Sequence, residues 1–500
     1  MKKRREPGEL FMNTIFDAVV ESREGDKTRY RNYLNGNWSF PDSVKEIEVT
    51  NPATGEVFAA VPMCAEHHVR TAVESAMTIQ ESDPFSPLER MGVIDRAAEI
   101  LQGCAEDIAR IITLETGKPV ASAEKEVIMT VERLHLVREE ARVLYGDYIP
   151  GEWVEDTENK FAIVLRKPLG VVAAISPFNY PLFIGAAKII PALVAGNSVV
   201  VKTASDTPLS LLLFTRILEE AGLTSGRIQI LTGKGSTLGS ALAENRNVSA
   251  ISFTGSTSAG RAIADQAGMK RLHLELGGNA AAIVFADADI PNAVSEICKG
   301  TFKNAGQRCD AISRVLVHKD IYTEFIDSVK EEAASYCGGD PFDSNTTIGP
   351  LINREALAKV NGLVQDAVEN GAEVVCGAKA ENLFYPATVL EKVTPSMDVA
   401  VKEIFGPVMP VIRVENDEEA VAISNASDYG LDSCIFTCDL NRAIEISKVL
   451  DDGTVNVNGA PAHGVGHFPF GGNKKSGMGR EGLKYSINEM TRLHTIVFNE

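Results

Sequence analysis

Residues 301–314 read Thr-Phe-Lys-Asn-Ala-Gly-Gln-Arg-Cys-Asp-Ala-Ile-Ser-Arg and centre on Cys309. A cysteine becomes a nucleophile when nearby positive charge or amide dipoles stabilise its thiolate. Arg308 adjoins the thiol, and Gly306 lets the backbone approach closely. Taken alone, each of the eight cysteines is more readily interpreted as a small buried hydrophobic residue. The assignment of Cys309 therefore depends on the rest of the chain.

Two other segments offer the partners that a nucleophilic cysteine needs. Residues 274–279 read Leu-Glu-Leu-Gly-Gly-Asn, so Glu275 is a candidate general base at the end of an apolar run. Residues 175–181 read Ile-Ser-Pro-Phe-Asn-Tyr-Pro and close a strand expected over 170–175, where the Asn179 amide can face a developing oxyanion. Amide, base and thiol in this order resemble the aldehyde dehydrogenase superfamily, from about Tyr33 to the C-terminus.

The resemblance implies a catalytic set of Asn179, Glu275 and Cys309. The thiolate would attack an aldehyde, with the oxyanion held by the Asn179 side chain and the Cys309 backbone N–H. After hydride loss to a nicotinamide, Glu275 would activate the water that resolves the thioester. A superfamily branch that transfers its acyl group to coenzyme A lacks this glutamate, so the expected product is a free acid.

Composition and charge narrow the class of protein. With 500 residues, 44% hydrophobic and 23% charged, the chain is expected to be a soluble globular protein of two or three domains. The formal charge of −19 disfavours nucleic acid as a partner. No apolar run has membrane-spanning length, and the basic start is not followed by an apolar core, so we expect a cytoplasmic protein with no membrane partner.

The cysteines and histidines predict neither a disulfide framework nor a metal site. Eight cysteines are sparse for a chain of this length, which favours reduced thiols. Cys64, His67 and His68 come close to a metal-like grouping, yet a helix opening at Glu66 would point them apart. We therefore expect no metal.

Alternating strand and helix patterns predict the fold. Strands rich in Val and Ile are expected near 171–175, 198–201, 228–231, 250–253 and 272–276, with helical segments between them. Such runs indicate a parallel sheet covered by helices on both faces. A second set near 314–318, 374–376, 407–414, 434–437 and 454–458 predicts a second α/β domain, which carries the thiol.

The segments before these sets are simpler. Helices are expected from about 69 to 145, and Asn35-Gly36 predicts a hairpin turn between short strands. Residues 1 to about 30 are charged and lack periodic apolar positions, so we expect them to pack loosely.

We expect an α/β protein of the aldehyde dehydrogenase type, with two Rossmann-like doubly wound domains and a small β ribbon. The predicted dinucleotide-binding domain comprises 1–146 and 167–277, and the predicted catalytic domain comprises 278–472. By the resemblance, 147–166 and 473–500 are oligomerisation elements of a homotetramer.

The cofactor site is predicted mainly from residues 253–260, Phe-Thr-Gly-Ser-Thr-Ser-Ala-Gly. A strand that leads through Gly and Ser into a helix offers free amides to a pyrophosphate, although a plain helix cap would look the same. The Gly-rich run 233–239 departs from the dinucleotide fingerprint. The resemblance decides for a nicotinamide dinucleotide and implies as cofactor-binding residues Ile175, Ser176, Lys202, Ser205, Gly235, Thr254, Gly255, Ser256, Leu276, Glu403 and Phe405.

The choice between NADP and NAD depends on Lys202 and Ser205. Members of the family that use NAD often carry a glutamate at the position of Ser205, where its carboxylate would repel a 2′-phosphate. Ser205 is uncharged and Lys202 would attract that phosphate, so NADP is expected, with NAD possible. Glu403 and Phe405 match positions that hold the nicotinamide ribose and line the nicotinamide.

Several segments look most similar to the non-phosphorylating glyceraldehyde-3-phosphate dehydrogenases, namely 176–181, 306–309, 468–470, 474–477 and 495–498. This implies oxidation of D-glyceraldehyde 3-phosphate to 3-phosphoglycerate without inorganic phosphate, a glycolytic reaction. Implied substrate-binding residues are Arg308, Tyr180, Arg142 and His463. Part of that branch has arginine in place of His463, and lactaldehyde, glyceraldehyde and succinate semialdehyde remain open as substrates.

Two other classes of protein were weighed. A cysteine hydrolase would need a histidine partner such as His463 or His467, but it has no use for dinucleotide segments. A catalytically silent structural homologue, like the lens crystallins recruited from enzymes, would not need Asn179, Glu275 and Cys309 together.

Overall fold

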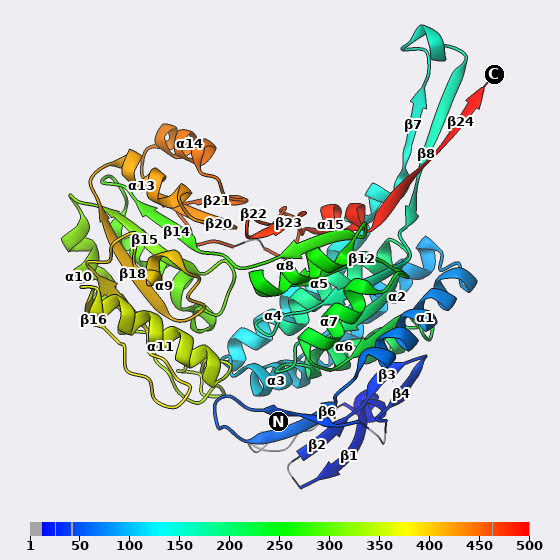
Figure 1. Ribbon diagram of the computed structural model, residues 1–500, viewed down its shortest axis with the longest axis horizontal. Coiled ribbons are helices and arrows are strands. Elements are labelled where there is room, and N and C mark those ends of the chain that lie inside the picture. Colours follow the sequence, from blue (N-terminus) through cyan, green and yellow to red (C-terminus); the bar gives the residue numbers. More distant parts are fainter. Residues whose placement is uncertain (1–12, 26, 42–43, 463, 500) are drawn as a thin grey trace.

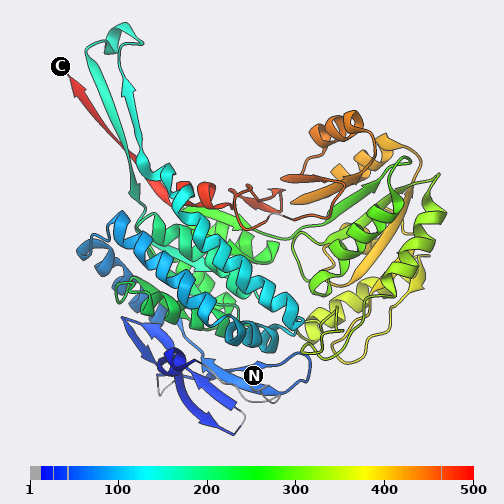
Figure 2. The same cartoon turned by 180° about the vertical axis from the view of Figure 1, so that it is seen from behind.

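The computed structural model describes residues 13–25, 27–41, 44–462 and 464–499, and it contains two large sheets, each flanked by helices (Figure 1). Figure 2 shows from behind that the two α/β units lie side by side, and that a narrow β ribbon projects from one of them. The predicted α/β fold class is confirmed, whereas the predicted domain boundaries stay predictions.

The first sheet has eight strands. In spatial order they are β23 (Gly477–Met478), β13 (Arg271–Glu275), β12 (Val248–Thr254), β9 (Val171–Ile175), β10 (Ser198–Lys202), β11 (Ile228–Leu231), β3 (Asn32–Leu34) and β4 (Asn37–Ser39). The five central strands pair in parallel, whereas β23 and β3 join antiparallel at the two sides. The carboxyl ends of the parallel strands therefore meet at one edge, where ligands bind in sheets of this kind.

Helices cover both faces of this sheet because its central strands are apolar on both sides. Val171, Ala173 and Ile175 belong to one core cluster, whereas Val172 and Ala174 belong to another, as the alternation of side chains along a strand requires. The helices of this unit are α1 (Glu66–Ser82), α2 (Pro87–Gly103), α3 (Ala105–Thr116), α4 (Val120–Glu140), α5 (Pro181–Val194), α6 (Leu209–Glu220), α7 (Gly235–Glu244) and α8 (Thr257–Ala267).

The second sheet has seven strands and its own hydrophobic core. In spatial order they are β16 (Glu373–Cys376), β17 (Thr388–Glu391), β18 (Val408–Val414), β15 (Ile312–His318), β14 (Ala280–Val284), β20 (Asp432–Phe436) and β21 (Thr454–Val457). Its helices are α9 (Ile290–Phe302), α10 (Tyr322–Ala333), α11 (Arg354–Glu369), α12 (Asp398–Val401), α13 (Asp417–Asn425) and α14 (Leu440–Val449). The short helix η4 (Lys303–Gly306) leads from α9 to Cys309.

The ribbon is a three-stranded antiparallel sheet of β7 (Asp147–Pro150), β8 (Lys160–Pro168) and β24 (Thr491–Asn499). The C-terminal strand β24 pairs with β8 of the same chain from Thr491 to Asn499, and Figure 1 shows this sheet standing away from the body. It is joined to the body by η2 (Ala141–Tyr145) and α15 (Leu483–Glu489). The short helix η3 (Glu155–Thr157) lies between β7 and β8, whereas β19 (Tyr429–Gly430) and β22 (Asn473–Lys474) form a separate two-stranded sheet.

The described residues between 13 and 30 pack more closely against the protein than their sequence suggested. Its described part forms η1 (Thr14–Val19), β1 (Val20–Glu24) and β2 (Lys27–Tyr30), which join β6 (Val57–Pro62) and β5 (Glu46–Thr50) in a four-stranded sheet. Phe16, Val19 and Tyr30 are fully buried in the core. The prediction of loose packing is therefore wrong for these residues, because isolated apolar side chains without a period still anchor a segment when they reach the core.

Candidate active site

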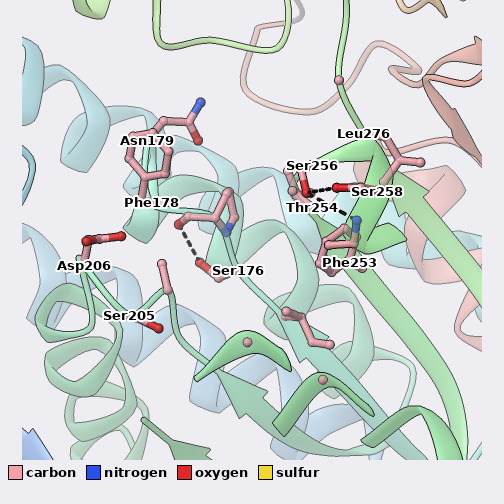
Figure 3. A pocket seen from close by; sticks show the side chains of 18 of the residues that line it. Ser176, Phe178, Asn179, Ser205, Asp206, Phe253, Thr254, Ser256, Ser258 and Leu276 are labelled. Atoms are coloured by element: carbon pink, nitrogen blue, oxygen red, sulfur yellow. Dashed lines mark hydrogen bonds between the residues drawn. The ribbon is translucent and has the colours of Figure 1, made fainter. Parts of the chain in front are cut away.

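All of the predicted cofactor-binding residues line one cavity of about 910 Å³ at the carboxyl edge of the first sheet (Figure 3). Cys309 and Asn179 line the same cavity, Cys309 reaching it from the second unit. The strand ends of β9, β10, β12 and β13 form its floor, and Glu403 and Phe405 close it from the second unit. The structure thus places in one cavity the residues that the sequence grouped only through the family resemblance.

Two helices begin at this cavity. Gly235 is the first residue of α7, and Ser256 caps α8, its hydroxyl accepting the Ala259 N–H at 3.3 Å. Free N–H groups at a helix N-terminus favour an anion such as a pyrophosphate. In addition, Thr254 Oγ1 is buried without a hydrogen-bond partner among the described residues, so it is free to bond a ligand in the cavity. These features fit a dinucleotide.

Lys202 and Ser205 lie at the end of β10 and just beyond it. The ammonium is largely buried, and this burial lowers the pKa of Lys202 to about 8, while Asp206 raises it. Ser205 donates its hydroxyl to the Gly233 carbonyl at 3.0 Å. Figure 3 shows Asp206 beside Ser205 on the same rim.

Asp206 is a cavity residue that sequence reasoning missed, although it directly follows a predicted one. Its carboxyl is exposed to the cavity, yet the surrounding protein limits its hydration and raises its pKa above the usual range, with Glu355 adding to the rise. The rim of the cavity therefore offers both a cation, Lys202, and a carboxyl, Asp206, to a ligand.

Glu403 and Phe405 hold the opposite side of the cavity. Glu403 Oε1 accepts the Gly278 N–H at 3.1 Å, and burial raises the pKa of this carboxyl. Phe405 has a positive φ of 57°, and its ring meets the Phe178 ring edge-on at a centroid distance of 5.8 Å. A bulky residue with positive φ is uncommon and persists where surrounding contacts require it.

A tight left-handed turn presents the thiol. Asn304, Ala305 and Gly306 have φ of 55°, 54° and 68°, and Gln307 then fixes the loop by accepting the Ile352 N–H at 2.9 Å. Burial raises the pKa of the Cys309 thiol well above its usual range; Asp310 raises it further, and Arg308 lowers it. The expected effect of Arg308 is present, but burial outweighs it.

Asn179 lies next to this turn. Its side-chain amide donates to the Gln307 carbonyl at 2.8 Å, and its carbonyl accepts from the Lys118 ammonium at 2.7 Å. The amide group is therefore held close to the loop that carries Cys309, as an oxyanion donor must be.

A buried ion pair between Lys118 and Glu126 holds the backbone carbonyl of Asn179 in place. Lys118 Nζ lies 2.6 Å from Glu126 Oε2 and 4.0 Å from the centroid of the Tyr180 ring, and both charged side chains are almost fully buried. Glu126 Oε1 also accepts the Leu182 and Phe183 N–H groups at the start of α5. Glu126 thus caps α5, the helix that follows Asn179, and also binds Lys118, which donates to the Asn179 carbonyl.

Glu275 lies at the end of β13, fully enclosed. Burial raises the pKa of its carboxyl well above the usual range, and Glu481 raises it further, whereas Lys188 and Arg480 lower it. Its Oε1 lies 3.2 Å from His273 Nε2. Leu276 and Gly277, the residues that directly follow it, line the cavity, and a buried carboxyl with a raised pKa at such a place is a candidate general base.

The four predicted substrate residues are placed differently from one another. Arg308 is buried, its Nε donating to Asp310 Oδ1 at 2.9 Å and its Nη2 to the Pro461 carbonyl at 3.2 Å. Tyr180 lies close enough for Arg308 to influence its pKa. Arg142 is exposed on η2 and does not line the 910 Å³ cavity, and His463 lies outside the described residues.

Lys303 is a second residue that sequence reasoning missed, although it stands within the segment first quoted. It is half-buried at the start of η4, and burial lowers its pKa to about 8, with repulsion from Arg308, Lys125 and Lys118 adding to the effect. The loop of Cys309 therefore lies among several cations.

The described residues contain neither a membrane-spanning helix nor a metal-ligand cluster. None of the helices described here is long and apolar enough to cross a membrane. Across 13–25, 27–41, 44–462 and 464–499, no group of three or more His, Cys, Asp or Glu side chains is arranged to hold a metal ion. Cys64 instead accepts from Asn32 Nδ2, and His68 Nδ1 accepts the Ala65 N–H.

Comparisons with known proteins agree with this geometry. Residues 38–496 match the model of the aldehyde dehydrogenase family. The chain is 40% identical to 3-sulfolactaldehyde dehydrogenase of Priestia aryabhattai over 471 residues, covering 94% of this chain and 98% of the relative. It is 40% identical to NADP-dependent glyceraldehyde-3-phosphate dehydrogenase of Streptococcus equinus over 473 residues, covering 94% and 99%.

A solved structure of NADP-dependent glyceraldehyde-3-phosphate dehydrogenase from Bacillus halodurans, complexed with NADP, superposes with a TM-score of 0.92. Its sequence is 40% identical, and the match covers 94% of this chain and 99% of that one. Lactaldehyde dehydrogenase from Escherichia coli superposes with a TM-score of 0.91 at 34% identity, covering 94% and 99%. The chain therefore belongs to the aldehyde dehydrogenase family and is an NAD(P)-dependent aldehyde dehydrogenase.

Proposed function

We propose that this enzyme oxidises D-glyceraldehyde 3-phosphate to 3-phosphoglycerate with NADP and without inorganic phosphate. The observation that carries the substrate class is the group of cations around the thiol loop. Lys118, Lys125 and Arg308 lie near enough to Lys303 to lower its pKa, whereas Asp310 raises it. Lys118 is paired with Glu126 and Arg308 with Asp310, so Lys303 and Lys125 are the cations outside these two pairs. Such a site attracts an aldehyde that bears a phosphate.

Three side chains perform the chemistry in this proposal. The Cys309 thiolate bonds to the aldehyde carbon, and the Asn179 amide and the Cys309 N–H hold the oxyanion. The nicotinamide, when bound, accepts a hydride from the substrate. Glu275 then takes a proton from the water that attacks the thioester, so the product leaves as a free acid.

The cofactor preference rests on the rim of the cavity. Lys202 supplies a cation, and Ser205 places a hydroxyl instead of a carboxylate beside it. Asp206 would weaken binding of a 2′-phosphate when ionised, and the limited hydration that raises the pKa of its carboxyl opposes that ionisation. Relatives named NADP-dependent, at 40% identity, support the same choice.

A second substrate is favoured by one specific finding. The 3-sulfolactaldehyde dehydrogenase of Priestia aryabhattai is 40% identical to this chain, and so is the NADP-dependent glyceraldehyde-3-phosphate dehydrogenase of Streptococcus equinus. Both aldehydes have three carbons, a 2-hydroxyl group and a tetrahedral anion at C3. The shared substrate chemistry is therefore a short hydroxyaldehyde with a terminal oxyanion group.

The test is a kinetic panel of kcat/KM with NADP and NAD. The substrates are D-glyceraldehyde 3-phosphate, 3-sulfolactaldehyde, D-glyceraldehyde, lactaldehyde and succinate semialdehyde. Highest kcat/KM on the phosphate supports the first proposal, and highest kcat/KM on the sulfonate supports the second. A preference for an uncharged aldehyde would reject the anion site.

Two variants locate the anion site. Arg308→Leu and Lys303→Met should each lower kcat/KM for the phosphorylated aldehyde by at least about tenfold, since charge-assisted hydrogen bonds contribute roughly 1.5 to 3 kcal/mol. D-Glyceraldehyde should be much less affected. Lys299→Met, an exposed lysine of α9, is the matched control. Equal loss on both aldehydes would mean that Arg308 acts on the thiol or only on Asp310.

We also infer self-association through the ribbon. Its exposed side chains include Tyr148, Trp153, Leu493 and Val497, which are 65%, 85%, 60% and 54% exposed. An apolar surface of this kind marks an interaction site. Light scattering should give the mass of a homotetramer, and Val497→Asp should lower it, whereas a wild-type monomer would contradict the inference.

A further inference from the structure

His273 and Glu275 form a closed pair on β13. They are two residues apart, so their side chains project from the same face of the strand. His273 Nε2 lies 3.2 Å from Glu275 Oε1, and His273 Nδ1 lies 3.2 Å from the hydroxyl of Ser252, its register partner on β12. All three residues are at most 3% exposed. A chain of hydrogen bonds thus runs from Ser252 through His273 to Glu275.

The direction of this chain follows from the state in which Glu275 acts as a base. Its carboxylate is then ionised and only accepts hydrogen bonds, so in that state His273 Nε2 carries a proton and donates a hydrogen bond to Oε1. The other ring nitrogen must then accept, and the Ser252 hydroxyl donates to it. Burial, followed by Lys188, lowers the pKa of His273, which keeps the ring neutral at neutral pH.

The two oxygens of Glu275 have different surroundings. Oε1 is engaged by His273, whereas Oε2 is buried and has no hydrogen-bond partner among the described residues. A buried carboxylate oxygen without a partner is costly unless a ligand or water meets it during function. The free oxygen is therefore the one available to a water molecule.

Two glycines of the C-terminal segment enclose the pair. A Cβ on Gly471 would lie 2.8 Å from Glu275 Oε1, and a Cβ on Gly479 would lie 2.8 Å from His273 Cδ2. Gly479 also has φ of +86°, which disfavours any other residue. The backbone approaches so closely that neither side chain has room to turn aside on that side.

We propose that His273 is a positioning residue for the base: it holds Glu275 Oε1 and favours the ionised carboxylate, leaving Oε2 to take the proton of the hydrolytic water. This rests on the proposed role of Glu275. In the step, a water O–H bond breaks, its proton bonds to Oε2 and its oxygen bonds to the thioester carbon. The Cys309 sulfur leaves with the electron pair of the S–C bond, and Glu275 later releases the proton to solvent.

Other charged groups act on the same carboxyl. Lys188 on α5, which pairs with Glu481 at 3.0 Å, and Arg480 both lower the pKa of Glu275. Glu481 and Glu489 raise it. Because these groups stay in place when His273 changes, the variants below report on the imidazole itself.

The test separates acylation from deacylation without a cofactor. An activated ester such as p-nitrophenyl acetate can acylate the Cys309 thiol, so the first equivalent of nitrophenolate reports acylation and later turnover reports deacylation. For His273→Phe we expect a first equivalent within about twofold of the wild-type rate and turnover lowered about 10- to 100-fold, the range of a hydrogen bond to a charged group.

The pH profile gives an independent readout. Losing a donor to the carboxylate raises the pKa of Glu275, so less base is ionised at a given pH. The rising limb of the deacylation rate in His273→Phe should therefore move about one pH unit or more toward higher pH. His273→Gln keeps an N–H donor and should lie closer to the wild type in rate and in profile.

Controls distinguish positioning from general damage. Gln229→Leu removes a buried amide from β11 of the same sheet, far from β13 in strand order, and should lower thermal stability without moving the pH profile. If His273→Phe does not fold, Ser252→Ala can be measured in its place. We then expect a smaller shift of the rising limb of the deacylation rate toward higher pH.

Specific outcomes would overturn the proposal. The positioning role is contradicted if the pH dependence of deacylation in His273→Phe is the same as in the wild type. It is also contradicted if acylation and deacylation lose the same factor in rate. A further loss when His273→Phe is added to Glu275→Gln contradicts it as well, because a residue that acts through Glu275 has nothing left to position. Retained turnover in Glu275→Gln alone would instead reject the base assignment, which is a separate failure.

Discussion

The two walls of the catalytic cleft differ in how they are built. The cofactor wall consists of strand ends and helix starts with small side chains, such as Thr254, Gly255 and Ser256. The thiol wall carries Cys309 and is backed by buried charges tied to distant segments, such as Lys118 with Glu126 and Arg308 with Asp310. The first wall depends on backbone position, whereas the second depends on partners. Single substitutions should therefore affect the two walls differently.

The largest effect on activity should come from a substitution that changes the thiol wall and leaves the cofactor wall intact. Cys309→Ala should abolish aldehyde oxidation, because Cys309 is the cysteine among the residues that line the cavity and a thiolate is the nucleophile that the reaction needs. Binding of NADP, measured by calorimetry, should stay within about twofold, since the cofactor wall is intact. Cys438→Ala, at an exposed thiol, is the control and should keep full activity. Measurable turnover in Cys309→Ala would remove the thiol from the reaction.

The partnered charges predict a large stability effect. Glu126→Ala leaves the buried Lys118 ammonium unpaired and uncaps α5, so it should lower the free energy of unfolding by about 3 to 5 kcal/mol. Glu124→Ala changes the same residue type at an exposed site of the same helix and should stay within about 0.5 kcal/mol. Chemical denaturation measures both. Equal stabilities would show that the pair is not needed.

Asn179 lies where the two walls meet. Asn179→Ala should lower kcat by about 10² to 10³, the usual loss of one oxyanion donor. The KM for NADP should change little. Asn370→Ala, at the exposed end of α11, is the control. An equal change in kcat and in the KM for NADP would indicate a disordered loop rather than a lost donor.

The smallest effect is expected on the cofactor wall. Ser205→Glu should reduce kcat/KM with NADP by about tenfold or more, because a carboxylate would repel the 2′-phosphate at close range. Asp206→Asn should raise it, since that substitution removes an existing carboxylate. Kinetics with both cofactors measure the ratio. A wild type that already prefers NAD tenfold would contradict the argument from Lys202.

Features that depend on neighbouring residues in the chain were predicted correctly from the sequence. Asn35 and Gly36 form the expected turn, with φ of 52° and 75°, because this conformation is set within the dipeptide. Predicted cofactor residues at strand ends, such as Ile175, Lys202 and Thr254, reached the cavity because strand ends in a parallel sheet share one edge. These positions follow from the fold class itself.

Partnerships across the chain were not predictable in the same way. Phe16 and Tyr30 are buried by contacts with helices far along the sequence, so no local period announces them. Arg308 was identified, but its bond to the Pro461 carbonyl joins segments that only tertiary structure brings together. His273 was missed, although the two-residue repeat of a strand places it on the face of Glu275.

The short strand β23 has a consequence for the synthesis of the enzyme. Gly477 pairs with Glu275, so the tail completes the sheet beside the base only after roughly 200 further residues have been made. At the usual 5 to 20 residues per second, the strand that bears Glu275 waits about 10 to 40 s for this partner. A chain arrested before the tail would therefore carry its thiol and most of its cofactor wall, but not a finished hydrolytic site.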